Sequence, residues 1–186
     1  MSEQSRLIFT IGHSTHSLDA FVALLKRHGV TAVADVRSTP FSRYSPHFNK
    51  DALEQSLRSQ GITYVFMGRE LGARSDDPAC YEEGRVQYSR LAVTESFRLG
   101  IERVMRGGRE HRITLMCAEK DPLECHRTLL VARTLDQQGV DVSHILADGT
   151  LETHQDAMGR LIDVTGLDRK STRLNSSHTD ISRMPS

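Results

Sequence analysis

The chain alternates short apolar runs with longer amphipathic segments, and this alternation restricts its possible folds more than any other feature. Five runs are rich in Val, Ile and other apolar residues and predict strands; they span residues 7–11, 31–36, 62–67, 112–117 and 140–146. The segments between them predict helices from their spacing of apolar residues; they span residues 17–28, 50–59, 94–105, 121–138 and 150–164. Alternating strands and helices form right-handed crossovers onto a parallel sheet. The sequence therefore predicts the α/β class, as a single three-layer domain with a mainly parallel sheet flanked by helices.

Local signals mark the ends of two predicted helices. Ser17 is a suitable N-cap for the first, and Gly29 ends it. Asp121 is a suitable cap for another, and Pro122 fits its first turn. We expect this second helix to begin at Asp121 and to run without a break to about residue 138.

The segment Gly68–Tyr88 joins the third predicted strand to the next part of the chain. It is polar and contains glycine and arginine residues. Long connections in compact domains often carry function. We therefore predict a long, functional loop here, and the sequence leaves open whether it closes over a ligand.

Composition and charge exclude several classes of protein. Lys and Arg together number 24, as do Asp and Glu. The balanced net charge does not indicate a strongly basic nucleic-acid-binding protein, although a local basic patch stays possible. No apolar run approaches the roughly 18 residues of a membrane span, and residues 1–6 lack the apolar core of a secretory signal. Three cysteines without a regular framework fit a reducing compartment. We expect a cytoplasmic protein without a membrane segment.

Residues 168–186 differ in composition from the rest of the chain. They contain no aromatic residue and almost no apolar periodicity, which is typical of a disordered tail. The run DRKSTRLNSSH resembles one reading frame of a common short-read sequencing adapter. We interpret the tail as a translated artefact and confine the predicted domain to residues 1–167.

Several short motifs carry a resemblance to a known family. They are TIGHS at residues 10–14, DVRSTP at 35–40 followed by Ser42-Arg43, Leu71-Gly72, and CAEKDP at 117–122 followed by Cys125-His126-Arg127. With these motifs, residues 7–167 resemble the domain of unknown function 488 family. The resemblance implies a small prokaryotic α/β protein and no particular activity, so function has to be argued from the residues.

The motifs place polar residues at the ends of three predicted strands. Gly12-His13-Ser14, Arg37-Ser38 and Cys117-Ala118-Glu119 each follow such a strand. Ligands of parallel α/β sheets bind at the carboxyl ends of the strands. We therefore expect these residues to surround one crevice, with Gly12 allowing close approach of the backbone to a ligand.

Cys117, His13 and Glu119 are the candidate catalytic residues. Cys117 would lie before the start of a helix, whose free amides lower the pKa of a thiol, and Lys120 would lower it further. It is then a nucleophile; the alternative is a buried small hydrophobic residue. His13 is either a general acid or base or a hydrogen-bonded structural histidine, and Glu119 is a second group able to move protons.

Cys125 and His126 fall in the first turns of the helix predicted from Asp121. Cys125 would then share a face with Leu129 and pack against the sheet. A redox pair of Cys117 and Cys125 is an alternative, although its spacing is not that of thiol oxidoreductases. A zinc site formed by Cys117, Cys125, His126 and His13 is a further alternative. The cysteines lack the close spacing of common zinc sites, however, so we expect no metal and no cofactor.

Arginines near the strand ends predict an anionic ligand, because guanidinium groups bind phosphate and carboxylate in a bidentate manner. Five are candidates: Arg37, Arg43, Arg69, Arg74 and Arg127. The alternative is that they pair with the chain's own acidic residues, as Arg37 would with Asp35. Phe41, Tyr44, Tyr64 and Tyr81 are aromatic surfaces for stacking on a base, or ordinary packing residues.

These residues support three hypotheses. The first is an enzyme acting on a phosphate-bearing ligand, such as a nucleotide or a nucleic-acid end. The second is a non-enzymatic module that binds nucleotides or nucleic acid, and the third is a thiol redox or sensor protein. The predicted ligand-binding residues are Gly12, Ser14, Arg37, Ser38, Arg43, Lys120, His126 and Arg127.

Overall fold

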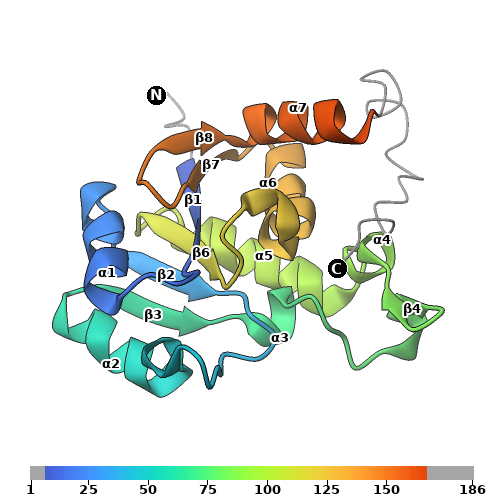
Figure 1. Ribbon diagram of the computed structural model, residues 1–186. Helices are drawn as coiled ribbons and strands as arrows, with labels where there is room; N and C mark the ends of the chain where they lie inside the picture. The colour runs from blue at the N-terminus through green and yellow to red at the C-terminus, as the bar shows by residue number, and fades with distance from the viewer. Residues whose placement is uncertain (1–6, 167–186) are drawn as a thin grey trace.

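A mainly parallel six-stranded sheet forms the centre of the molecule (Figure 1). The computed structural model describes residues 7–166, so the predicted domain boundary and the tail at 168–186 lie outside the described residues. The strands are β1 Leu7–Gly12, β2 Ala32–Asp35, β3 Thr63–Phe66, β6 Ile113–Cys117, β7 Asp141–Ile145 and β8 Leu151–Thr153. Their order is β3-β2-β6-β1-β7-β8, with β8 alone antiparallel to its neighbour. The predicted fold class is confirmed.

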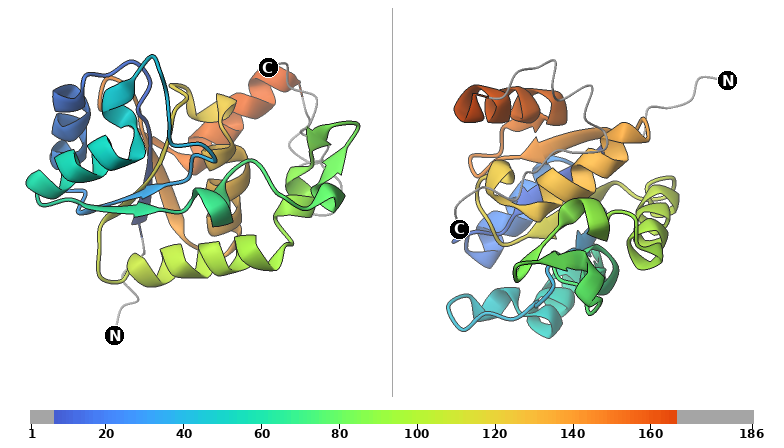
Figure 2. Two further views of the ribbon diagram at one scale, coloured as in Figure 1. Left: turned by 90° about the horizontal axis from the view of Figure 1, so that it is seen from below. Right: turned by 90° about the vertical axis from the view of Figure 1, so that its right-hand side faces the viewer.

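Helices cover both faces of this sheet, and Figure 2 shows α5 on the face opposite α1 and α2. The helices are α1 Leu18–Arg27, α2 Lys50–Ser59, α3 Gly68–Leu71, α4 Tyr88–Leu91, α5 Glu95–Gly107, α6 Arg133–Gln137 and α7 His154–Thr165. The Ser17 side chain caps α1 by accepting a hydrogen bond from the amide of Ala20, as predicted. In the part of the chain that the structure describes, no helix has the length and apolar character needed to cross a membrane.

Side chains alternate between the two core layers along each strand, because successive residues point to opposite faces. In β6, Ile113, Leu115 and Cys117 face the layer that contains α5. Met116 faces the other layer, beside α1 and α2. Alternation thus places the Cys117 thiol in the α5 layer, within the core.

The prediction of a long loop at Gly68–Tyr88 is wrong, because the segment has secondary structure of its own. The segment contains α3, a 3₁₀ turn and a hairpin of β4 (Tyr81–Glu82) and β5 (Arg85–Val86). Glu83 and Gly84 join the two strands with φ angles of 48° and 76°, the backbone of the tight turns that suit strand twist. Because Leu71 and Cys80 are buried in the core, this segment packs as part of the domain.

The predicted helix at 150–164 begins later than expected, because its first residues form β8. Gly149 adopts a φ of +81° in the turn between β7 and β8, where glycine has no steric penalty. The amide of Leu146 then donates to the carbonyl of Thr150 across the hairpin at 2.9 Å. The Thr153 side chain caps α7 by accepting from the amide of Asp156.

The helix predicted from Asp121 to residue 138 is interrupted. Pro122–Glu124 forms a 3₁₀ turn, and Cys125 is extended, with φ −134° and ψ 138°. A π-helix, Arg127–Ala132, follows and continues into α6. The Asp121 carboxylate accepts hydrogen bonds from the amide of Leu123 and from Arg160. It therefore caps only the short 3₁₀ turn. π-Helical turns often occur at functional sites.

A buried hydrogen-bonded pair of histidines links β7 to the start of α7. His144 Nδ1 lies 2.8 Å from Thr10 Oγ1, and His144 Nε2 lies 3.2 Å from His154 Nδ1. Burial, and then the proximity of His154, lower the pKa of His144 to about 3, and burial also lowers the pKa of His154. The folded protein therefore holds both rings neutral at pH 7.

Acid should destabilise the fold through this pair. His144 stays neutral in the folded state while the unfolded chain takes up a proton below its ordinary pKa of 6.5. Its stabilisation is complete above pH 6.5 and falls as the pH drops toward 3, by roughly 2 kcal/mol at pH 5. Urea unfolding at pH 7 and pH 5 measures the loss, and His144→Asn should reduce it. An unchanged pH dependence in His144→Asn would contradict the assignment.

Candidate functional site

The carboxyl ends of β1, β2 and β6 lie together, because β6 is between the other two in the sheet. Backbone pairing continues past the strands: the amide of His13 donates to the carbonyl of Cys117, and the amide of Ser14 donates to that of Ala118, both at 2.9 Å. Val36 is bonded in the same way to Met116 at 3.0 Å. The structure therefore brings the three sequence motifs to one edge of the sheet.

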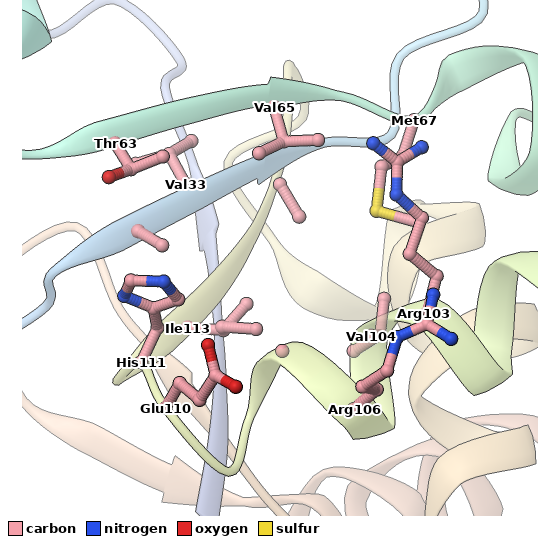
Figure 3. Close-up of a pocket in the computed structure, with 13 residues that line it drawn as sticks. Val33, Thr63, Val65, Met67, Arg103, Val104, Arg106, Glu110, His111 and Ile113 are labelled. Carbon is pink, nitrogen blue, oxygen red and sulfur yellow. The ribbon is translucent and has the colours of Figure 1, made fainter.

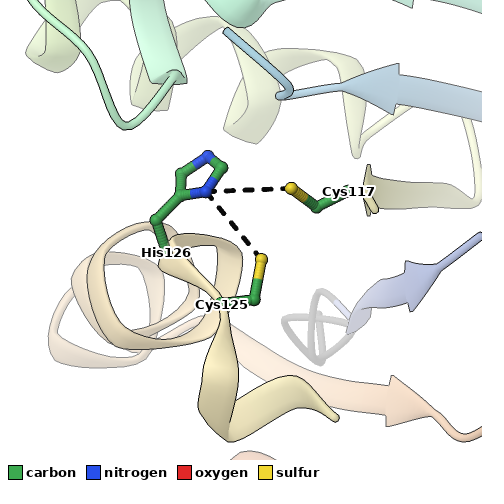
Figure 4. A group of neighbouring side chains, drawn as sticks. All are labelled: Cys117, Cys125 and His126. Carbon is green, nitrogen blue, oxygen red and sulfur yellow. Dashed lines mark hydrogen bonds between the residues drawn. The ribbon is translucent and has the colours of Figure 1, made fainter. Parts of the chain in front are cut away.

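Cys117, Cys125 and His126 form a compact group that we call the thiol cluster (Figure 4). His126 Nδ1 lies 3.8 Å from the sulfur of Cys117 and 3.8 Å from that of Cys125. All three ligand atoms lie within 4.8 Å of one another. The side chains are buried, with exposed fractions of 3%, 2% and 7%. Two thiols thus share one imidazole nitrogen inside the protein.

The orientation of the His126 ring is set by the main chain. Its Nε2 lies 3.0 Å from the carbonyl oxygen of Val36, which can only accept a hydrogen bond. Nε2 therefore carries a proton, and Nδ1 is the nitrogen that exchanges protons with the two thiols. Sequence reasoning missed the Val36 carbonyl, because a backbone acceptor leaves no signal in residue type.

The break in the helix gives Cys125 the environment that we predicted for Cys117. The amide of Arg127, at the start of the π-helix, donates to the sulfur of Cys125 at 3.4 Å. Burial alone would raise the pKa of Cys125, but hydrogen bonds with Cys117 and His126 and the charge of Arg127 lower it to about 6. We predicted that a helix terminus lowers the pKa of Cys117. This prediction is wrong, because the thiol at the helix terminus with a lowered pKa is that of Cys125.

Cys117 and His126 have pKa values shifted in the opposite direction. The hydrogen bond to Cys125, together with burial, raises the pKa of Cys117. Burial would lower the pKa of His126, but the hydrogen bond with Cys125 and the charge of that thiolate raise it. In the reduced cluster, Cys125 is thus the thiol that gives up its proton more readily, and His126 is placed to accept it.

Glu119 connects the cluster to the surface. The sulfur of Cys125 donates to Glu119 Oε2 at 2.9 Å, while the residue itself is exposed. Burial of the carboxyl would raise its pKa, but hydrogen bonds from Cys117 and Cys125 lower it. Glu119 is therefore a charged proton acceptor at the point where the cluster approaches solvent.

His13 lies near the cluster but belongs to another hydrogen-bonded group. Its Nδ1 lies 3.1 Å from the carbonyl of Ser14, and its Nε2 lies 3.3 Å from Arg37 Nη1. The ring stacks on Phe48 with centroids 4.3 Å apart. Burial, followed by the charge of Arg37, lowers the pKa of His13 to about 4. His13 is therefore neutral at pH 7, and its role as acid or base stays a prediction.

Arg37 is bound by its own chain. Its guanidinium donates to both oxygens of Asp35, at 2.9 and 2.6 Å, and to the carbonyl of Phe48 at 2.8 Å. Tyr64 also donates to Asp35, at 2.6 Å. The predicted ligand-binding role of Arg37 is not what this geometry favours; the alternative pairing with Asp35 is the one observed.

Arg127 likewise holds the loop that follows β6, and its side chain is 1% exposed. It donates to the carbonyl oxygen of Glu119 at 2.8 Å and to Thr10 Oγ1 at 3.4 Å. Gly12 lies under the same loop, because a Cβ there would come within 1.8 Å of the Glu119 oxygen. The close approach that we predicted at Gly12 is thus made by the protein's own backbone.

The remaining predicted ligand-binding residues do not form one arginine-lined crevice. Ser38 Oγ accepts from the amide of Arg74 at 3.2 Å, so it is engaged within the chain. Lys120 and Arg43 are exposed. Arg43 is flanked by Phe41 and Tyr44, which are 64% and 98% exposed. Among the basic members of the predicted ligand-binding set, Arg43 in its surface loop and Lys120 are thus the ones that remain exposed.

A hollow of about 310 Å³ lies elsewhere in the molecule (Figure 3). Its lining includes Ala32, Thr63 and Ile113, at the starts of their strands, and Arg103 and Arg106 of α5. Its lining runs along β2 and β3 as far as Met67, just past the end of β3, and includes no member of the thiol cluster. We therefore place the candidate site by the chemistry of the side chains and not by this hollow.

Comparison with known families agrees with the motifs in the sequence. A family model described as "Domain of unknown function DUF488" matches residues 17–134, more than half of the chain. This range includes all three members of the thiol cluster. Comparison with curated proteins and with solved structures finds no match.

Proposed function

The chain belongs to the DUF488 family, and from the geometry of its site we propose that it is a thiol redox protein in which Cys117 and Cys125 form a reversible disulfide. The observation that carries the proposal is the pair of 3.8 Å contacts from both sulfurs to one imidazole nitrogen. Thiolate attack is the step common to disulfide chemistry, and a shared proton acceptor serves both thiols. The third sequence hypothesis is thus the best supported.

The arrangement assigns different roles to the two cysteines. We assign Cys125 as the attacking thiol, because its pKa is lowered and its sulfur contacts Glu119, an exposed residue. Cys117, whose pKa is raised, is then the resolving thiol. Both side chains are almost fully buried, which restricts the oxidant to a small molecule such as a low-molecular-weight disulfide.

The reaction is a two-electron exchange. The Cys125 thiolate attacks one sulfur of the small disulfide, and the departing thiolate takes a proton from His126. Cys117 then gives its proton to His126 Nδ1 and attacks the Cys125 sulfur. The second thiolate leaves with that proton. The two cysteines lose two electrons and two protons in total, and the small disulfide becomes two thiols.

The phosphate-bearing ligand that the sequence also predicts has less support. Arg37 and Arg127 donate to Asp35 and to backbone carbonyls, and neither presents its full guanidinium to a ligand. Arg43 and Tyr44 are exposed in the same loop, and they are the residues that still favour a phosphate-bearing ligand such as a nucleotide. The thiol proposal also fits a cytosolic location for a single domain of residues 1–167, since thiols stay reduced there.

Oxidation tests the proposal directly. Protein kept in EDTA is treated with oxidised glutathione, digested without reduction and analysed by mass spectrometry. We expect a Cys117–Cys125 linked peptide, and Cys80→Ser should give the same result because Cys80 lies outside the cluster. Cys117→Ser should accumulate a glutathione adduct on Cys125, since no resolving thiol remains. Folded protein without the linked peptide, or Cys117→Ser without the adduct, would refute the assignment.

A further inference from the structure

The thiol cluster also has the donor set of a soft-metal site. Two thiolates and an imidazole are the preferred ligands of Zn²⁺, and carboxylate oxygen is a common fourth ligand. We infer that reduced Cys117, Cys125 and His126 bind one Zn²⁺ ion, with Glu119 at the fourth position. This inference goes beyond the disulfide chemistry and does not depend on it.

The distances from His126 Nδ1 to the two sulfurs fit tetrahedral coordination, and the three donor atoms all lie within 4.8 Å of one another. Zn–S bonds of ~2.3 Å and Zn–N bonds of ~2.1 Å at tetrahedral angles place sulfur and nitrogen about 3.6 Å apart. In the structure, His126 Nδ1 lies 3.8 Å from each sulfur. Glu119 Oε2 lies 2.9 Å from the Cys125 sulfur, so this exposed carboxylate is already next to one of the two thiolate ligands.

The surroundings of His126 supply the support that a ligating histidine needs. Metal-bound histidines usually donate their second ring N–H to a carboxylate or a backbone carbonyl, which fixes the tautomer and the ring plane. His126 Nε2 does this with the carbonyl of Val36 at 3.0 Å. Its Nδ1 is therefore directed at the two sulfurs before any ion arrives.

The fold assembles these donors from separate segments. Cys117 ends β6, while Cys125 and His126 follow the 3₁₀ turn, and the extended backbone of Cys125 turns its thiol back toward the strand. A continuous helix from Asp121 would have placed this thiol on a helical face instead. The inferred site therefore keeps three of the four residues considered from the sequence, with Glu119 in place of His13 as the fourth ligand.

Cobalt and zinc binding test the inference under reducing conditions. Apo-protein in a phosphine reductant is titrated with Co²⁺, followed by competition between Zn²⁺ and a chromophoric chelator. We expect one ion per chain, with thiolate-to-cobalt charge-transfer bands and the visible bands of tetrahedral cobalt. Cys117→Ser, Cys125→Ser and His126→Gln should each weaken zinc binding at least about 100-fold, since outer-shell changes alone cost 10–100-fold. Cys80→Ser should bind as the wild type does.

The outcomes separate the inference from the proposed function. Absence of the thiolate charge-transfer band in wild-type protein, or unchanged binding in His126→Gln, would overturn the metal site. Circular dichroism of the metal-free variants shows whether they fold, and the wild-type cobalt spectrum decides the matter where one does not. The oxidation experiment is performed in EDTA, so failure of the disulfide leaves this result unaffected, and failure of metal binding leaves the disulfide unaffected.

Discussion

Replacing Gly12 by alanine should cost more than about 4 kcal/mol of folding stability, in the range reserved for severe steric or core defects. A Cβ at this position would lie 1.8 Å from the carbonyl oxygen of Glu119 and 2.8 Å from its carbonyl carbon. Both are backbone atoms, so no side-chain rotation relieves the overlap. The loop would have to lift, which would break the 2.8 Å hydrogen bond from Arg127 and displace the thiol cluster. Urea unfolding measures the loss.

Gly61→Ala is the matched control for this substitution. Gly61 has a φ of +73°, and nothing lies within 4 Å of the position that its Cβ would take. Only the strain of the left-handed backbone is expected, about 1–2 kcal/mol. Equal losses in the two variants would mean that the loop after β6 yields easily, and that its contact with Gly12 is unimportant to the fold.

Removing the Arg37 guanidinium should be nearly as damaging. Arg37→Met leaves the Asp35 carboxylate fully buried, with Tyr64 as its remaining side-chain donor. Breaking a buried ion pair in this way typically costs about 3–5 kcal/mol. Chemical denaturation of the variant measures the loss, and the double variant Asp35→Asn with Arg37→Met should regain most of it, because no buried charge remains.

An exposed ion pair provides the comparison. Arg58 donates to Glu54 at 2.9 Å from the surface of α2, with a side chain that is 79% exposed. Arg58→Met should change stability by at most about 0.5 kcal/mol. A loss in Arg37→Met no larger than this would indicate that Arg37 serves a ligand and not the fold, which would restore the anion-binding reading of the sequence.

The strands and helices were largely predictable because their signals are local. The apolar run at 112–117 predicted a strand that is observed as β6, and its Leu115 and Cys117 side chains lie in the same core layer. Ser17 marked the start of α1 from its hydroxyl alone. The short strand β8 was missed, since three residues are too few for a periodic pattern and its pairing with β7 depends on the turn at Gly149.

The candidate site was predictable in its place and not in its chemistry. Three motifs at strand ends indicated where polar residues gather, because parallel strands end at one edge of the sheet. The sequence could not predict which of the two thiols contacts a helix amide. Asp121 and Pro122 predict the start of a helix, but the extended backbone at Cys125 ends that helix after one turn. The lowered pKa consequently belongs to Cys125.

The sequence by itself determined the α/β class, the order of most elements and the strand-end position of the motifs, because apolar periodicity and end signals act over a few residues. Only the tertiary structure decided what the polar side chains do there. Arg37 bonds to Phe48, and Arg127 to Thr10, and His126 points at two thiols because Val36 holds its other nitrogen. These partners lie far apart along the chain, and buried donors choose the acceptors that packing brings within reach.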